Sequence, residues 1–192
     1  MMRSGAVLVI LLGVGIAACG RPADSPDDTV PPPMPAADSR AGAQVDGDHI
    51  APGVVPGGAV VELVDRNGRR VGGARLEDTP QGVRISIRVT GLSEGEHGLH
   101  FHEAGRCDPP DFQSAGGHFA PHGREHGFEN PAGPHAGDLP NIRGNAQGVA
   151  DTSFVAASVR LSAAAAEGLL REGGTALVVH ARRDDYRTDP SG

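Results

Sequence analysis

Histidines crowd into one part of this chain. Six of the nine histidines lie between positions 100 and 135, and another, His180, follows an apolar run. A single histidine is usually a solvated residue or a satisfied member of a core. A cluster this dense is typical of a metal-binding region, because neutral imidazole is a common ligand of transition metals. The chain is therefore expected to fold so that these side chains meet.

The sequence on both sides of this region predicts short β-strands. Residues 83–89 alternate between apolar and polar side chains, which is the period of a half-buried strand. The 29 glycines and 16 prolines among 192 residues argue against a helical bundle. The pattern predicts an all-β sandwich or barrel with one long loop over residues 103–143. Further strands are expected at residues 59–64, 71–76, 98–102, 149–154, 158–161 and 175–180.

The spacing of the candidate ligands indicates two sites. His100 and His102 are two positions apart on a predicted strand, so both imidazoles project from the same face. His180 can complete that site from another strand, and several imidazoles around an open side suit copper. On the loop, three imidazoles and one carboxylate make the closed four-donor set that structural zinc favours: His118, His126, His135 and Asp138.

These motifs resemble the copper/zinc superoxide dismutase family over residues 60–192. The resemblance rests on Gly98-Leu99-His100-Phe101-His102-Glu103, Ala115-Gly116-Gly117-His118-Phe119, His126-Gly127, Pro134-His135-Ala136-Gly137-Asp138-Leu139-Pro140-Asn141 and Leu177-Val178-Val179-His180-Ala181.

The resemblance implies that the chain folds as a Greek-key β-barrel or sandwich. It also implies that the substrate of the protein is superoxide. Copper would be bound by His100, His102, His118 and His180, and zinc by His118, His126, His135 and Asp138. His118 would bridge the two metals and act catalytically by passing a proton to the product. Asp184 would orient His100 and His126 through hydrogen bonds. His97 and His122 match no ligand position and are expected at the surface.

The resemblance also implies that the family continues beyond Asp189-Pro190-Ser191-Gly192. The segment that this sequence lacks would supply an arginine beside copper, a cysteine matching Cys107 and the last strand of the barrel. The main expectation is a superoxide dismutase that disproportionates superoxide to dioxygen and hydrogen peroxide. The alternative is a non-catalytic copper- and zinc-binding envelope lipoprotein that buffers metal. A structural adhesion module would not need a complete ligand set.

The N-terminus predicts export and lipid anchoring. Arg3 precedes an apolar run that ends at Cys19, as in a bacterial lipoprotein signal, so residues 1–18 are expected to be a signal peptide and Cys19 to be lipidated. Residues 19–55 are rich in proline and aspartate and predict a disordered linker before a domain at 56–192. The expected location is the cell envelope, at the periplasmic face of either membrane or the outer face of a single membrane. The net charge of −7 argues against a general nucleic-acid surface. The sequence leaves the oligomeric state undecided, and a homodimer is one possibility.

Overall fold

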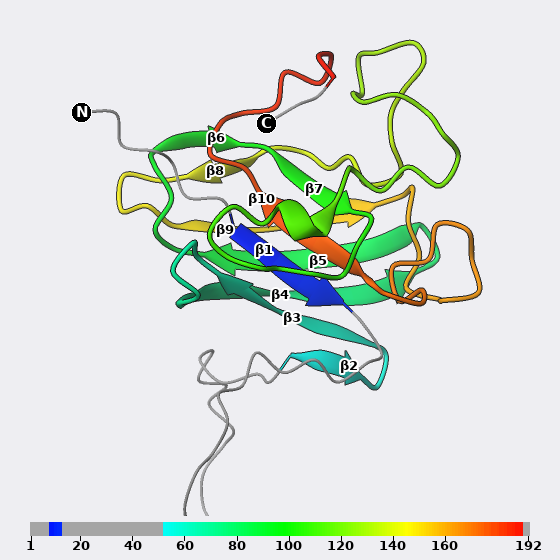
Figure 1. Cartoon of the computed structure of the whole chain (residues 1–192), viewed down its shortest axis with the longest axis horizontal. Coiled ribbons are helices and arrows are strands. Elements are labelled where there is room, and N and C mark those ends of the chain that lie inside the picture. The colour runs from blue at the N-terminus through cyan, green and yellow to red at the C-terminus, as the bar shows by residue number, and fades with distance from the viewer. Residues whose placement is uncertain (1–7, 13–51, 190–192) are drawn as a thin grey trace, which may run out of the picture. The chain divides into compact units, whose positions relative to one another are not determined.

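The computed structural model describes Leu8–Leu12 and residues 52–189, and its regular structure is almost entirely antiparallel β-sheet (Figure 1). One sheet has the strand order β7-β10-β1-β3-β4-β5-β9, with β2 also paired to β3, and β6 and β8 form a second sheet. The all-β fold expected from the sequence is confirmed. The strands are β1 Leu8–Leu12, β2 Gly53–Val55, β3 Gly58–Val64, β4 Arg70–Thr79, β5 Gly82–Val89, β6 Gly95–His97, β7 Leu99–His102, β8 Ile142–Gly144, β9 Ala150–Ala156 and β10 Thr175–Val179.

The large sheet encloses a single main core. Strands from distant parts of the sheet order contribute to the same buried cluster, including Leu63 of β3, Ile85 of β5, Phe101 of β7 and Leu177 of β10. Such contacts require the sheet to curl around its apolar face. The other face of β10 is covered by a smaller cluster of Phe112, Ala115, Ala176 and Val178, beside which the half-buried Cys107 packs. Burial on both faces explains why β10 reads as a continuous apolar run.

One expected strand is absent from the described structure. Residues 158–161 form a loop in which the Arg160 N–H donates to the Glu167 carbonyl and the Leu169 N–H donates to the Arg160 carbonyl. Val159 and Leu161 are buried in the main core from this loop. Their alternation therefore reflects two apolar anchors on a compact loop, and it does not reflect a paired strand.

The N-terminal predictions fall mostly outside the described residues. Cys19 and nearly all of the predicted linker lie there, although β2 occupies the end of the linker range and pairs with β3. Leu8–Leu12, inside the predicted signal peptide, forms β1 and pairs with β10 along its whole length and with β3 at Val9. β1 therefore lies between β10 and β3 in the large sheet. Among the described residues, no helix is long and apolar enough to cross a membrane.

Phe101 links the core to the strand that carries His100 and His102. Its side chain is completely buried, because the alternation of β7 directs it to the opposite face from the two histidines. Replacing Phe101 with alanine is expected to lower the free energy of unfolding by about 3–5 kcal/mol, through lost burial and a cavity. Denaturant melts of the metal-free chain measure this loss. Phe128→Ala is the matched control, since Phe128 is 46% exposed. Equal losses in the two variants would contradict this account of β7.

Asp65 stabilises the turn between β3 and β4. Its Oδ1 accepts hydrogen bonds from the Asn67 and Arg69 N–H groups at 2.8 and 3.0 Å, and its Oδ2 accepts from Arg69 Nε at 2.8 Å. Burial alone would raise the pKa of Asp65. The hydrogen bonds from Arg69 and Asn67 outweigh burial and lower this pKa from 3.8 to about 2.

A depressed pKa in the folded state makes the Asp65 contribution dependent on pH. The contribution is complete above the ordinary value of 3.8 and is lost as the pH falls toward 2. The difference in unfolding free energy between the natural chain and Asp65→Asn should therefore be constant near neutral pH and shrink between about pH 4 and 2. Denaturant melts across this range measure it. A difference that stays constant throughout would show that the Asp65 charge contributes nothing.

Candidate metal centre

The long loop reaches the candidate ligands on β7 by running along the outer edge of that strand. The Phe101 N–H donates to the Gly137 carbonyl, and the Phe119 N–H donates to the Phe101 carbonyl, both at 2.8 Å. Isolated bridges accordingly set His118 opposite His102 and Asp138 opposite His100. Two loop segments that are distant in sequence are thereby held beside the same strand.

This close approach depends on a glycine. A Cβ atom on Gly137 would lie 2.5 Å from the Phe101 carbonyl oxygen and 3.0 Å from the Phe119 Cβ. Any larger residue would push the loop away from β7. Asp138 follows directly, so the glycine is what lets the carboxylate reach the histidines.

The first cluster consists of four imidazoles. His100, His102, His118 and His180 each offer a ring nitrogen, and these nitrogens all lie within 4.8 Å of one another. This is the set that the sequence predicted for copper. His102 Nδ1 donates to the Gly116 carbonyl at 2.8 Å, which leaves the Nε2 lone pair facing His180 Nε2 at 3.5 Å. The hydrogen bond therefore fixes the tautomer that a metal requires.

Burial favours the neutral form of three imidazoles in this cluster, those of His100, His102 and His180. Burial is the main cause that lowers the pKa of His102 to about 4 and the pKa of His180 to about 2. Repulsion from neighbouring histidines also acts to lower both pKa values. Burial likewise lowers the pKa of His100. Neutral imidazoles have free lone pairs, so these three residues offer nitrogen donors without first losing protons.

The second cluster surrounds one carboxylate oxygen. Asp138 Oδ1 lies 3.0 Å from His126 Nδ1 and 3.3 Å from the Nδ1 atoms of both His118 and His135. A tetrahedral zinc with bonds of about 2.0–2.1 Å separates neighbouring donor atoms by about 3.3 Å. The three contacts of Asp138 Oδ1 thus match the donor spacing of a zinc site. A second four-donor grouping contains His100 beside His118, His126 and Asp138, so His100 lies close to both clusters.

Buried nitrogen atoms without hydrogen bonds indicate that the clusters fit metal ions. The Nδ1 atoms of His100, His118 and His135 are buried and have no hydrogen-bond partner. A buried polar atom in this condition costs about 1–3 kcal/mol unless a ligand compensates. All three point to metal coordination, because each belongs to one of the two donor sets.

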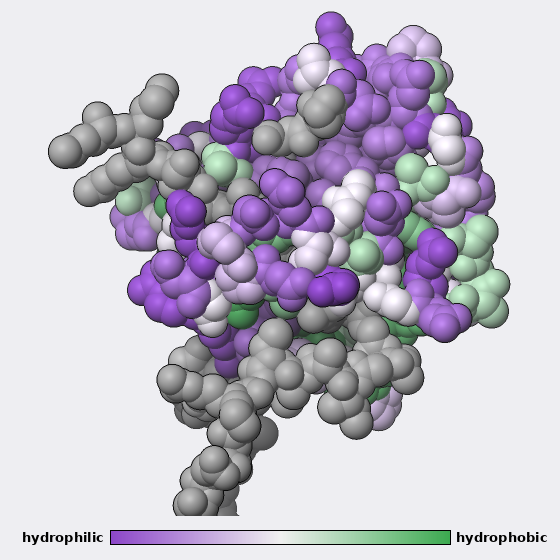
Figure 2. Space-filling model, viewed as in Figure 1, coloured by the Kyte–Doolittle hydropathy of each residue, from purple (hydrophilic) through white to green (hydrophobic). Residues whose placement is uncertain are grey.

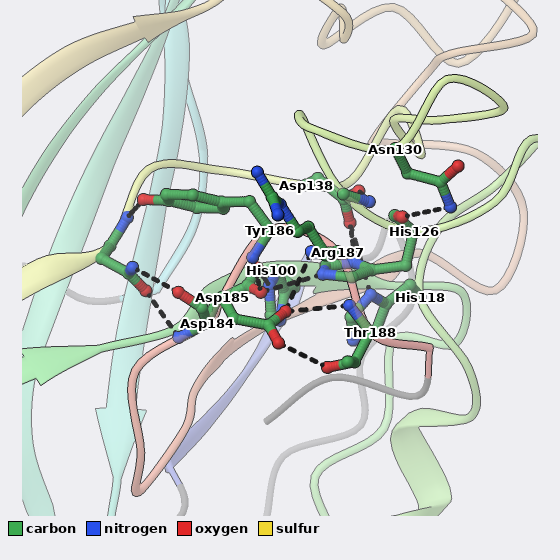
Figure 3. Close-up of polar contacts among 12 residues, drawn as sticks. His100, His118, His126, Asn130, Asp138, Asp184, Asp185, Tyr186, Arg187 and Thr188 are labelled. Carbon is green, nitrogen blue, oxygen red and sulfur yellow. Dashed lines mark hydrogen bonds and ion pairs between the residues drawn. The ribbon is translucent and has the colours of Figure 1, made fainter.

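Asp184 connects the two clusters. Its carboxylate is fully buried, and it accepts a hydrogen bond from His100 Nε2 at 2.8 Å and from His126 Nε2 at 3.0 Å (Figure 3). These two hydrogen bonds turn the rings of His100 and His126 so that each Nδ1 atom faces its own cluster. Burial lowers the pKa of His126, but hydrogen bonds to Asp138 and Asp184 outweigh it and raise this pKa to about 9. In the metal-free chain His126 is therefore a cation between two carboxylates.

The structure corrects one prediction and adds residues that the sequence did not indicate. His97, expected at the surface, is buried; its Nδ1 donates to the His180 carbonyl at 2.8 Å. It therefore holds the main chain of a candidate ligand. His122 is exposed as expected and contacts Glu167. Two further residues, Asn141 and Tyr186, surround Asp184.

Comparisons with known proteins show which family this chain resembles. The family described as copper/zinc superoxide dismutase matches residues 71–192. Superoxide dismutase [Cu-Zn] 1 of Aquifex aeolicus is 44% identical over 132 residues, which are 68% of this chain and 78% of the relative. Superoxide dismutase-like protein YojM of Bacillus subtilis is 37% identical over 190 residues, which are 97% of this chain and 88% of the relative.

Solved structures show the same similarity. The crystal structure of a superoxide dismutase-like protein from Bacillus subtilis has a TM-score of 0.67 and 42% identity, and covers 69% of this chain and 89% of that one. The Cu/Zn superoxide dismutase from Brucella abortus has a TM-score of 0.56 and 29% identity, with the same coverage of both chains.

Proposed function

Because the chain belongs to the copper/zinc superoxide dismutase family, we propose that it disproportionates superoxide to dioxygen and hydrogen peroxide. The observation that carries this proposal is the position of His118, whose ring belongs to both donor clusters. A site built only to store metal has no need for one imidazole shared between two different donor sets.

The proposed ligands follow from the geometry of the two clusters. His100, His102, His118 and His180 would hold copper, and His118, His126, His135 and Asp138 would hold zinc. Copper would supply a one-electron redox couple, which zinc lacks. Asp138 contributes the only carboxylate of the two sets. Burial alone would raise its pKa, but the contacts with His118 and His126 and the hydrogen bond from the Gly127 N–H outweigh burial and lower this pKa, which favours the ionised form.

The role proposed for His118 is to hold and deliver a proton. Its Nδ1 faces Asp138 Oδ1 at 3.3 Å, so its Nε2 is left for the first cluster. A proton on Nε2 would face the first cluster, while the Nδ1 contact with Asp138 keeps the ring in place. The remaining ligands need only hold their positions, and the hydrogen bonds to Gly116 and Asp184 serve that purpose.

The open side of the first cluster suits a small anionic substrate. The His118 side chain is 11% exposed, whereas the side chains of His100 and His126 are completely buried. Arg182 and Arg183 are exposed just after His180 and can attract an anion; Arg187 instead pairs with Glu129. The surface over the long loop is mostly hydrophilic in the view of Figure 2.

The test is the rate of superoxide dismutation per copper ion in the full chain. The chain is loaded with copper and zinc, and compared with the same chain loaded with zinc alone. A rapid rate that requires copper supports the enzyme. Stoichiometric binding of both metals without turnover would contradict the proposal and favour metal buffering. Failure to bind either metal would exclude both functions.

We further propose that the chain is a lipid-anchored protein of the cell envelope, attached through Cys19. The support is the apolar run and the small residues that precede this cysteine. Cys19→Ala is expected to abolish labelling of the expressed protein by a radioactive fatty acid and to release it from the membrane fraction. Equal labelling of the variant and the natural chain would disprove the anchor.

A further inference from the structure

We propose that Asn141 and Tyr186 are positioning residues that hold Asp184 in place and so fix the orientation of the two metal clusters relative to each other. This inference rests on the proposed function in that the two clusters bind metals. Asp184 lies in an irregular segment after β10, and its two carboxylate oxygens must reach histidines on β7 and on the loop at the same time. Such a double contact requires the main chain of Asp184 to be fixed.

Asn141 fixes the main chain of Asp184 from both sides. The Asp184 N–H donates to Asn141 Oδ1 at 3.0 Å, and Asn141 Nδ2 donates to the Asp184 carbonyl at 2.9 Å. One side-chain amide thus replaces the pair of hydrogen bonds that a neighbouring strand would make. Asn141 lies three positions after Asp138 and directly before β8, so it joins the segment of a zinc-cluster ligand to the segment that follows His180.

Tyr186 fixes the carboxylate and anchors the same segment to the loop. Its N–H donates to Asp184 Oδ1 at 2.7 Å, and its carbonyl accepts from the Glu129 N–H at 3.0 Å. Its hydroxyl oxygen accepts from the Asn141 N–H at 2.8 Å. The ring extends away from the histidines in Figure 3, while the main chain stays beside Asp184. Tyr186 adopts a φ of 62°, which is uncommon for a residue other than glycine.

A glycine on the loop lets this segment approach. Gly127 has a φ of 107°, and a Cβ atom there would lie 2.0 Å from the Tyr186 carbonyl oxygen. Gly127 directly follows His126, which is one of the two histidines that Asp184 contacts. The main chains around Asp184 and His126 are therefore packed against each other. Asn141 and Tyr186 fix the position of one main chain relative to the other.

The test uses the full chain with Asn141→Ala and Tyr186→Phe. Loss of an outer hydrogen-bond partner typically weakens metal affinity by about 10- to 100-fold. Asn141→Ala is expected to weaken zinc binding by about that factor and to change the absorption spectrum of cobalt bound in place of zinc. Tyr186→Phe removes one hydrogen bond and should show a smaller change in the same direction.

Asn145→Ala is the matched control. The Asn145 side chain stabilises a turn through the Gln147 and Val149 N–H groups and contacts neither cluster. It should lower stability while leaving zinc affinity and the cobalt spectrum unchanged. If Asn141→Ala behaved in the same way as this control, its role would be purely structural and the inference would be overturned.

A second measurement does not depend on metal. Nitrogen-15 spectra of the metal-free chain report which ring nitrogens of His100 and His126 carry protons. The natural chain should show hydrogen-bonded Nε2–H groups on both rings, and Asn141→Ala should lose them. Unchanged spectra would overturn the inference. A natural chain that shows these locked rings but binds no metal would contradict the proposed function and still support the positioning role.

Discussion

Replacing His180 with alanine is expected to abolish copper-dependent dismutation and to leave the second cluster nearly intact. His180 supplies one of four nitrogens in the first cluster and none around Asp138. Loss of an outer partner of a metal ligand already costs about 10- to 100-fold, so loss of a ligand should lower the rate per added copper by about 100-fold or more. The measurement is the dismutation rate at fixed copper and zinc, together with the zinc affinity.

The control for this variant is a histidine outside both clusters. His122→Ala removes an exposed imidazole that contacts Glu167 and belongs to neither cluster. It should keep the natural rate. A His180→Ala chain that retains the natural rate would show that dismutation does not occur at this cluster. Parallel losses of copper and zinc binding would show that His180 stabilises the fold generally.

Replacing Asp138 with alanine is expected to abolish stabilisation of the chain by zinc. The variant loses the oxygen that three imidazoles surround, and it also leaves the Gly127 and His135 N–H groups without the acceptor that they use at 2.8 and 3.0 Å. A ligand present at about a thousand times its dissociation constant stabilises a folded protein by about 4 kcal/mol. The natural chain should show a gain of this order with zinc, and the variant almost none.

Two further variants identify the cause of that loss. Asp138→Asn keeps an acceptor for the two N–H groups but removes the charge, so it separates loop geometry from metal binding. Asp111→Ala removes a carboxylate from an exposed position elsewhere in the loop and should respond to zinc like the natural chain. If Asp138→Ala were still stabilised fully by zinc, the donor set around Asp138 would be incorrect.

Sequence periodicity predicted the strands that carry the core. Alternation over residues 83–89 requires one buried face, and Val83, Ile85, Ile87 and Val89 are all buried in β5. The same rule placed His100 and His102 on one face of β7. It failed for residues 158–161, because two apolar residues that anchor a loop repeat with the same period as a strand.

The candidate ligands could be recognised because their residue types are chemically unusual in such numbers. Among the residues that hold them, Asp184 was recognised through the family resemblance, whereas His97, Asn141 and Tyr186 were not. His97 differs from the neighbouring ligands only in what it contacts, and its partner is a main-chain carbonyl 83 positions away. Asn141 and Tyr186 act through hydrogen bonds that form only after the segment following β10 has folded over the loop. Contacts of this kind leave no periodic signal in the sequence.

The pairing of β1 makes the timing of folding matter for export. Leu8–Leu12 is held by β10 in the folded chain, and the sequence predicts that the same residues serve as part of an export signal. A secretion channel accepts an apolar segment only while it is unpaired. Folds with many distant β-contacts form in about milliseconds to seconds. For the export proposed above, a precursor that folds before translocation would bury its own signal in the sheet, so translocation would have to precede closure of the sheet.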